Sequence, residues 1–391
     1  MRALVLVDGE HYLPVVRDAL DGLPYEVAGV LVVGGTEKLV GGEDYGVPRV
    51  DALDAVDADV VVDLSDEPVL GPRERLLWAS RALALGLPYE GADFRFEPPP
   101  FHEVGVPSLA VVGTGKRIGK TAVTGHVARL LAGERRVVVV SMGRGGPAVP
   151  EVVETPPGLD DLVALARSGR HAASDHLETA ALAGVPTVGC RRAGGGLAGA
   201  VTDSNVLEGA RAALALDPDL LVLDGSGAAL PPVAADARIL VTGGVHDVRE
   251  GLNAYRVLVS DLVVDTGGAD HEAIRAIADV PVVRAELRLR PQRPLGGRRT
   301  AVFTAGPAPT EHLDAEVVHV SRNLARRDAL REDLRHVDAE VYLVELKAAA
   351  IDVVAETALE RGAEVVLAAN DVVADGLDEH VLRLVGEVVG V

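Results

Sequence analysis

Residues 113–131, GTGKRIGKTAVTGHVARLL, decide the fold of this chain. The apolar run SLAVV at 108–112 comes directly before them and is typical of a buried strand, and TAVTGHVARLL at 121–131 is typical of a helix. A strand that ends in a glycine-rich turn and leads into a helix directs backbone N–H groups and the helix N-terminus toward one point, where phosphate groups bind. The segment therefore predicts a phosphate-binding loop (P-loop).

The loop departs from the usual pattern G-x-x-x-x-G-K-[ST] at one position. Thr114 stands where the first glycine belongs, and Gly113 lies one residue earlier. A chance glycine-rich turn would not account for the Gly-Lys-Thr run at its end. In such a loop Lys120 reaches the β- and γ-phosphates of a nucleotide, and the Thr121 hydroxyl binds Mg²⁺. The residues expected to hold the nucleotide are Gly113, Thr114, Gly115, Lys116, Arg117, Ile118, Gly119, Lys120 and Thr121.

The rest of the chain has the composition of an α/β protein. Hydrophobic residues make up 48% of the 391 residues and aromatic residues only 3%. Valine- and leucine-rich runs alternate with amphipathic stretches almost throughout, which predicts parallel sheets covered by helices on both faces. No apolar run reaches the roughly 18 residues that span a bilayer. The single cysteine, Cys190, excludes an intramolecular disulfide and favours a reducing cytoplasm.

The formal net charge of −21 argues against binding to nucleic acids or to anionic membranes. In so acidic a chain, basic clusters among glycines indicate places that receive an anion. Three such clusters follow strand-like runs: GKRIGK at 115–120, MGRGG at 142–146 and CRRAGGG at 190–196.

Two proline-rich stretches, 94–107 and 288–300, divide the chain. We expect a small Rossmann-like α/β domain over residues 1–100 and a P-loop NTPase domain with a parallel sheet over 106–290. Residues 298–391 form a C-terminal α/β part, which either completes the main sheet or makes a subdomain of its own.

Chemistry-bearing residues follow several of the expected strands. Asp224 ends the apolar run LLVLD and begins a D-x-x-G turn, where a carboxylate would contact Mg²⁺ directly or through water. Arg144, Arg191 and Arg192 lie in the other two basic clusters, and arginines on flexible glycine loops suit bidentate phosphate contacts. Ligands of open parallel sheets bind beyond the carboxyl ends of the strands, so these loops are expected to face one crevice. The alternatives are an ordinary Asp-Gly turn and solvated charged loops.

A further cluster, DGEHY at 8–12, ends the first strand. Glu10 and His11, with Asp8 beside them and Arg17 in the following helix, are candidates for acid–base chemistry or ligand binding. A purely structural role is the alternative.

Five segments together resemble the cyclic 2,3-diphosphoglycerate synthetase family. The resemblance extends in order from the N-terminus to about residue 235, and the P-loop also resembles that of dethiobiotin synthetase. The segments are LVDGEHYLPVVRDAL, GTGKRIGKTAV, SMGRGGP, GVPTVGCRRAGGGLAG and LDGSGAALPPV.

The resemblance implies an ATP-dependent ligase that closes a phosphoanhydride within 2,3-diphosphoglycerate and releases ADP and phosphate. Two phosphates of charge near −2 held about 4.5 Å apart repel by ~15 kcal/mol at an effective dielectric constant of about 20, so fixed cations must offset this repulsion. The surplus cations of the loops are therefore expected to serve a second polyphosphate. The implied roles are catalysis by Lys116, Lys120 and Arg144; substrate binding by Glu10, His11, Arg17, Arg144, Arg191 and Arg192; and Mg²⁺ binding by Thr121 and Asp224.

Three other functions stay open at this point. A ligase of the dethiobiotin or cobyrinic acid type would activate a carboxyl or carbamate group, and this function would not explain the pair Arg191 and Arg192. A nucleotide-gated switch or metallochaperone would need a base-reading [NT]-K-x-D motif and a metal-binding tract, and the sequence has neither. A binding module without turnover is the third. A homodimer is common for enzymes of this size and class, but no feature of the sequence requires one.

Overall fold

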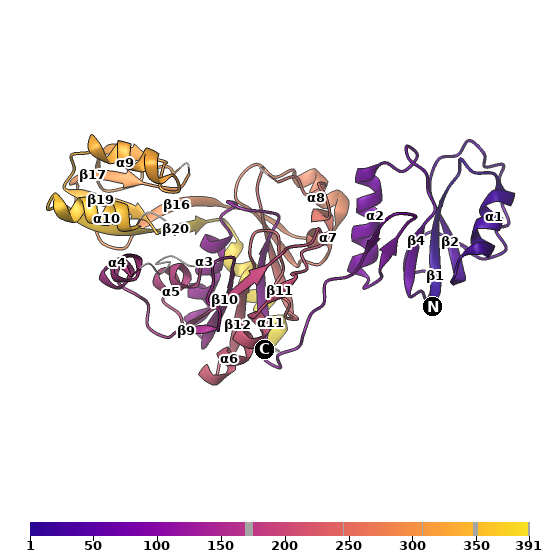
Figure 1. The fold of residues 1–391 in the computed structure, drawn as a ribbon, viewed down its shortest axis with the longest axis horizontal. Helices are drawn as coiled ribbons and strands as arrows, with labels where there is room; N and C mark the ends of the chain where they lie inside the picture. Colours follow the sequence, from indigo (N-terminus) through magenta and orange to yellow (C-terminus); the bar gives the residue numbers. More distant parts are fainter. Residues whose placement is uncertain (169–174, 245, 307, 347–350, 390–391) are drawn as a thin grey trace.

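The computed structural model describes residues 1–168, 175–244, 246–306, 308–346 and 351–389. Three α/β units follow one another along the chain, each with its own sheet (Figure 1). Within these sheets most neighbouring strands are parallel, which confirms the expected fold class.

The central unit contains the P-loop. Its strands lie in the order β11-β10-β8-β12-β7-β13-β14-β15, with β9 antiparallel to β10. The strands are β7 (Ser108–Gly113), β8 (Val137–Gly143), β9 (Glu151–Val153), β10 (Thr187–Ala193), β11 (Asp203–Ser204), β12 (Leu220–Asp224), β13 (Ala237–Thr242), β14 (Leu262–Asp265) and β15 (Val282–Arg284). The helices are α3 (Lys120–Ala132), α4 (Leu159–Arg167), α5 (Asp175–Ala183), α6 (Val206–Ala213), α7 (Asn253–Leu258) and α8 (His271–Ile277), with a 3₁₀ turn at Leu214–Leu216.

Helices cover both faces of this central sheet, because its strands are apolar on both sides. In β7, Leu109 and Val111 belong to a core that includes residues of α3, whereas Ala110 and Val112 belong to a core that includes residues of α6, α7 and α8. All six residues of β7 are buried. This two-sided burial is what a continuous Val/Leu run in a parallel sheet predicts.

The N-terminal unit has the strand order β3-β2-β1-β4-β5-β6 and stands to one side of the central unit (Figure 1). Its helix α2 packs against α7, and the Arg73 guanidinium lies 3.4 Å from the Asp247 carboxylate. The elements are β1 (Arg2–Asp8), α1 (Leu13–Gly22), β2 (Glu26–Gly34), β3 (Arg49–Val50), β4 (Val60–Asp63), α2 (Pro72–Ala84), β5 (Tyr89–Glu90) and β6 (Arg95–Phe96).

The C-terminal residues form a sheet of their own, β16-β20-β19-β17-β18, and do not extend the central one. Strand β16 belongs to this sheet, so the unit begins near residue 286. Its last helix, α11, returns to pack against the central unit, where Leu377, Val381 and Val385 join the core beside α3. The elements are β16 (Glu286–Pro291), β17 (Arg299–Phe303), β18 (Glu316–Ser321), α9 (Arg327–Arg335), β19 (Val341–Glu345), α10 (Ile351–Glu360), β20 (Glu364–Val373) and α11 (Leu377–Val389).

Candidate functional site

The strand order of the central sheet brings the expected loops to one edge. Strands β10, β8, β12 and β7 are parallel neighbours, so their carboxyl ends meet at the same side. These ends carry, in that order, Arg192, Arg144, Asp224 and the P-loop. The anion-binding loops, far apart in sequence, are therefore adjacent in space.

Steric constraints explain most of the glycines of the P-loop. A β-carbon on Gly113 would lie 2.8 Å from Ile118 Cδ1 and 3.1 Å from the Gly227 carbonyl oxygen, and one on Gly115 would lie 2.3 Å from the His246 ring. Gly119 has a φ of 77° and caps α3. Arg117 also has a positive φ, 61°, which costs a non-glycine residue roughly 1–2 kcal/mol.

Thr114 replaces the usual glycine because its position has room for a side chain. It is buried, and its hydroxyl lies 3.1 Å from the hydroxyl of Thr242 at the end of β13. A second threonine, Thr266, donates to the Ile118 carbonyl at 2.8 Å. Two Thr-Gly-Gly turns, after β13 and β14, therefore brace the two ends of the loop.

Replacing Thr114 with valine should destabilise the protein by about 1–2 kcal/mol, because Thr242 loses its buried hydroxyl partner. The affinity for a non-hydrolysable ATP analogue should change little, since the backbone of the loop is retained. Thermal unfolding and calorimetric titration measure the two effects. As a control, Thr114→Val combined with Thr242→Val removes both partners and should cost less than the sum of the single variants. Strictly additive losses would show that the two hydroxyls do not interact.

Lys120 and Asp224 form the polar centre of the site. The Lys120 ammonium contacts Asp224 Oδ1, and the Thr124 hydroxyl donates to the same oxygen at 2.8 Å. The Ser141 hydroxyl, from β8, lies 3.4 Å from Asp224 Oδ2. The Asp224 carboxylate is buried and the Lys120 side chain is 11% exposed, so the pair is held at the inner end of the site. Thr121, next to Lys120 in the first turn of α3, is half-buried.

Three cationic side chains converge on Gly227, in the turn after Asp224. A β-carbon built on Gly227 would lie 3.5 Å from Arg144 Nη2, 3.6 Å from Lys116 Cγ and 3.8 Å from Arg192 Nη2. Arg192 donates to the carbonyl oxygens of Gly194, at 2.6 Å, and Ser226, at 2.8 Å. Within the described ranges neither Lys116 nor Arg144 has a carboxylate partner, and both are exposed. The cluster formed by Lys116, Arg144 and Arg192 is hereafter the basic cluster.

Arg191 is placed differently from Arg192. Successive side chains of a strand point to opposite faces, so Arg191 faces away from the turn that Arg192 contacts. Its side chain is exposed, and its backbone N–H donates to Asn205 Oδ1 at 2.7 Å. The two arginines of the pair therefore do not contribute equally to the basic cluster.

The N-terminal candidates lie in their own domain. Asp8 Oδ1 accepts hydrogen bonds from the Glu10 amide and from His11 Nδ1, and Oδ2 accepts one from the Asp66 amide. Burial opposes ionisation of Asp8, but these hydrogen bonds outweigh it and hold the carboxyl pKa below its ordinary value. Arg17 lies elsewhere, beside a hollow of about 680 Å³ between α1 and the segment 45–47. In the described part of the chain, no hydrogen bond or ion pair joins Glu10, His11 or Arg17 to the central unit.

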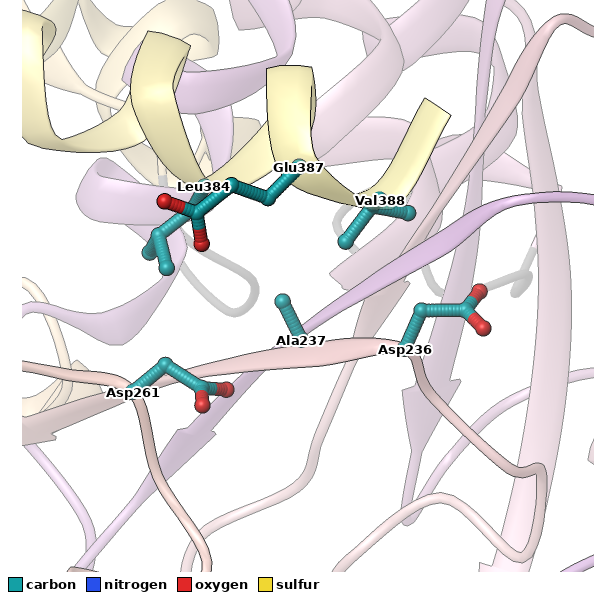
Figure 2. A pocket seen from close by; sticks show the side chains of 6 residues that line it. All are labelled: Asp236, Ala237, Asp261, Leu384, Glu387 and Val388. Atoms are coloured by element: carbon teal, nitrogen blue, oxygen red, sulfur yellow. The ribbon is translucent and has the colours of Figure 1, made fainter. Parts of the chain in front are cut away.

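A second hollow, of about 330 Å³, lies under α11 at the opposite edge of the central sheet (Figure 2). Its acidic side chains include Asp236 and Asp261, which accept hydrogen bonds from the backbone amides of Ser108 and Arg238 at 2.8 Å each. These carboxylates hold the amino-terminal ends of the strands, so we assign them a structural role.

Sequence reasoning missed Thr242, Thr266 and His246. The His246 ring lies 3.2 Å from the Lys116 carbonyl oxygen and fills the space over Gly115. The repeated turns VTGG at 241–244 and DTGG at 265–268, each at the end of an apolar run, were the signal that could have found the two threonines.

Three family models match the chain in order. They are described as the N-terminal domain, the P-loop domain and the C-terminal domain of cyclic 2,3-diphosphoglycerate synthetase, and they match residues 2–97, 108–281 and 301–371. The similarity therefore continues beyond residue 235, where the resemblance of the sequence motifs ended.

Curated relatives with the name cyclic 2,3-diphosphoglycerate synthetase match over nearly their whole length. The protein of Rubrobacter xylanophilus is 50% identical, with 98% of this chain and 97% of the relative covered. The protein of Thermococcus gammatolerans is 43% identical, with 99% and 98% covered. Among solved structures, LpxK from Aquifex aeolicus in complex with ATP is 16% identical with a TM-score of 0.44, covering 73% of this chain and 90% of that one, a likeness too weak to support an argument. In the described residues, no helix is long and apolar enough to cross a bilayer.

Proposed function

The chain belongs to the cyclic 2,3-diphosphoglycerate synthetase family, and from that premise we propose that it converts 2,3-diphosphoglycerate to its cyclic phosphoanhydride with ATP. The observation that carries the proposal is the basic cluster beside Lys120 and Asp224. A nucleotide alone would occupy the P-loop, which follows β7. A second anion of high charge would account for Arg144 and Arg192, which lie two strands and three strands away, at the ends of β8 and β10.

The chemistry requires two displacements at phosphorus. First, an oxygen of one substrate phosphate attacks the γ-phosphorus of ATP; the bond to the β-phosphate breaks and ADP leaves. Second, an oxygen of the other substrate phosphate attacks the phosphorus of the first, closes the ring, and expels the transferred group as inorganic phosphate. ATP and 2,3-diphosphoglycerate thus give the cyclic product, ADP and phosphate.

The nucleotide side is formed by the P-loop and Asp224. Lys120 would leave the carboxylate to contact the β- and γ-phosphates. The Thr121 hydroxyl and the Asp224 carboxylate are oxygen donors of the kind that Mg²⁺ prefers, so these residues fit the ion. Among the described residues no group of three or more His, Cys, Asp or Glu side chains could hold a metal, so the phosphates would supply further ligands. When bound, Mg²⁺ neutralises charge on the phosphates.

The acceptor side is formed by the basic cluster. Arg144 and Lys116, for which the described residues provide no carboxylate partner, would contact the two substrate phosphates and the transferring group. Arg117 is exposed on the strained loop and would lie near the transferring group, and Arg192 both fixes the turn at Ser226 and adds positive charge. Such fixed cations act by positioning and by electrostatic stabilisation of the transition state.

Four further residues remain predictions. Arg191 would act at longer range than Arg192, since it faces away from the cluster. Glu10, His11 and Arg17 would reach the substrate only if the N-terminal domain came closer to the P-loop than it does in this structure.

Phosphate release from ATP, measured with and without 2,3-diphosphoglycerate, tests the function. We expect release to depend on the diphosphate, with one phosphate formed per cyclic product detected by ³¹P NMR. 3-Phosphoglycerate is the matched control, because it keeps the glycerate but has no second phosphate to close the ring. ATP hydrolysis that ignores the diphosphate would contradict the proposal.

A further inference from the structure

Arg256, on the short helix α7, is the largest fully buried side chain in the described part of the protein, at 1% exposure. Burial lowers the pKa of its guanidinium to about 10, which still leaves it charged at neutral pH. A buried charge is costly, and in the described residues no carboxylate pairs with this one. The role of Arg256 therefore lies in the groups to which its guanidinium N–H groups donate.

The guanidinium donates almost entirely to backbone carbonyls. Nε and Nη2 donate to the Ala228 oxygen, at 2.8 and 2.5 Å. Nη1 donates to the Leu197 and Leu252 oxygens, each at 3.1 Å, and lies 3.2 Å from Asn253 Oδ1. The side chain thus joins three segments: the glycine-rich loop after β10, the turn after Asp224, and the start of α7.

Two of these segments border the basic cluster. The loop after β10 follows directly on Arg192 and Ala193, the last two residues of that strand, and the turn after Asp224 contains Gly227, the point on which the cluster converges. Arg192 joins the two segments from one side, through the carbonyls of Gly194 and Ser226, and Arg256 joins them from the buried side.

The junction is also tightly packed. The Leu230 amide donates to the Gly199 carbonyl oxygen at 2.9 Å, which ties the two segments together by their backbones. Gly199 has a φ of 93°, and a β-carbon there would lie 2.8 Å from Leu230 Cγ and 3.1 Å from Arg256 Nη2. The arrangement leaves no space for the loops to slide past each other while Arg256 stays in place.

We propose that Arg256 is a positioning residue for the acceptor: by holding the carbonyls of Leu197 and Ala228 it fixes the loop that follows Arg192 against the turn at Gly227, on which the three cations of the basic cluster converge. These hydrogen bonds of Arg256 to the two segments are hereafter the clamp. This inference rests on the proposed function, since it names a residue that shapes the substrate pocket without touching substrate. The partners of the Arg256 guanidinium are Leu197, Ala228, Leu252 and Asn253, and none of them belongs to the P-loop or is Asp224, which form the nucleotide side.

Two substitutions separate the effect of the guanidinium's hydrogen bonds from the effect of its positive charge. Arg256→Lys keeps the positive charge but cannot reach three carbonyls at once, and Arg256→Met keeps much of the volume without charge. If the clamp is what matters, both should raise the KM for 2,3-diphosphoglycerate by about 10- to 100-fold. The dissociation constant of a non-hydrolysable ATP analogue should stay within about threefold of the parent value, because the P-loop is untouched.

Val257→Ala is the matched control, since Val257 is fully buried in the same helix and its truncation destabilises the core without altering the clamp. An equal rise in KM in this control, at a similar melting temperature, would reduce Arg256 to a stabilising residue and overturn the proposal. A parent-like KM in Arg256→Lys would overturn it as well. If the Arg256 variants do not fold, Gly199→Ala perturbs the same junction from the other loop and should show the same rise in KM.

Amide hydrogen exchange provides a readout that needs no turnover. In Arg256→Lys, peptides spanning 194–201 and 225–231 should exchange faster together, while a peptide spanning 113–121 keeps its protection. Unchanged exchange in the two loops would contradict the clamp even if the KM for 2,3-diphosphoglycerate rose as expected. If phosphate release by the parent protein did not depend on 2,3-diphosphoglycerate, while the two loop peptides still exchanged faster together in Arg256→Lys, only the proposed function would be overturned.

Discussion

Replacing Lys120 with methionine is expected to lower the rate of ATP-dependent phosphate release by about 10³-fold or more. Methionine keeps most of the alkyl chain, so the loss reports on the charge. The negative charge that develops between the β- and γ-phosphates would then face no cation from the P-loop. Steady-state phosphate release at saturating 2,3-diphosphoglycerate measures the effect. Lys38→Met, in the N-terminal domain, is the control and should retain nearly all activity.

The same substitution should also destabilise the fold, because it leaves the Asp224 carboxylate buried without its cation. We expect a loss of about 2–3 kcal/mol, detected as a lower melting temperature by circular dichroism. Adding Asp224→Asn removes the orphaned charge and should restore most of the stability but none of the activity. A double variant that regained turnover would show that Lys120 serves the carboxylate and not the nucleotide.

The P-loop and the α/β class were predictable because both are encoded locally. The strand, the glycines and Gly-Lys-Thr lie within 24 consecutive residues, 108–131, and periodicity alone separates buried strands from amphipathic helices. The same holds for Asp224 and Arg144, which end apolar runs, because a parallel sheet gathers all its carboxyl ends on one edge. Convergence on a single edge follows from the fold class.

The order of the strands along that edge was not predictable in this way. Only tertiary structure places β10 and β8 beside β12 and β7, and only then do Arg144 and Arg192 meet at Gly227. Arg256 was missed for a related reason. In the sequence it is one arginine of a short, mixed helix, and nothing local shows that its donors meet the carbonyls of loops some 30 and 60 residues away. The shift of the first glycine to Gly113 also depends on a distant contact, the close approach of Gly227.

Replacing Arg144 with alanine is expected to lower kcat/KM for 2,3-diphosphoglycerate by about 10²- to 10³-fold. Of the two arginines in the basic cluster, Arg144 is the exposed one; like Lys116 it has no carboxylate partner in the described ranges, and its guanidinium approaches Gly227. It is therefore the guanidinium most able to bind an incoming phosphate. The affinity for an ATP analogue should change much less, since Lys120 and the P-loop amides are retained.

Two further arginines make this test discriminating. Arg211→Ala removes an exposed guanidinium from α6, in the same domain, and should leave turnover near the parent value, which excludes a general effect of net charge. Arg191→Ala should reduce kcat/KM by less than Arg144→Ala, because Arg191 lies on the face of β10 that points away from the cluster. Since Arg144 is exposed, added guanidinium ions should partly restore the alanine variant, whereas a variant with a collapsed loop would not respond. If Arg191→Ala proved more damaging than Arg144→Ala, the acceptor would have to bind on the opposite side of β10, and the basic cluster would lose its assignment.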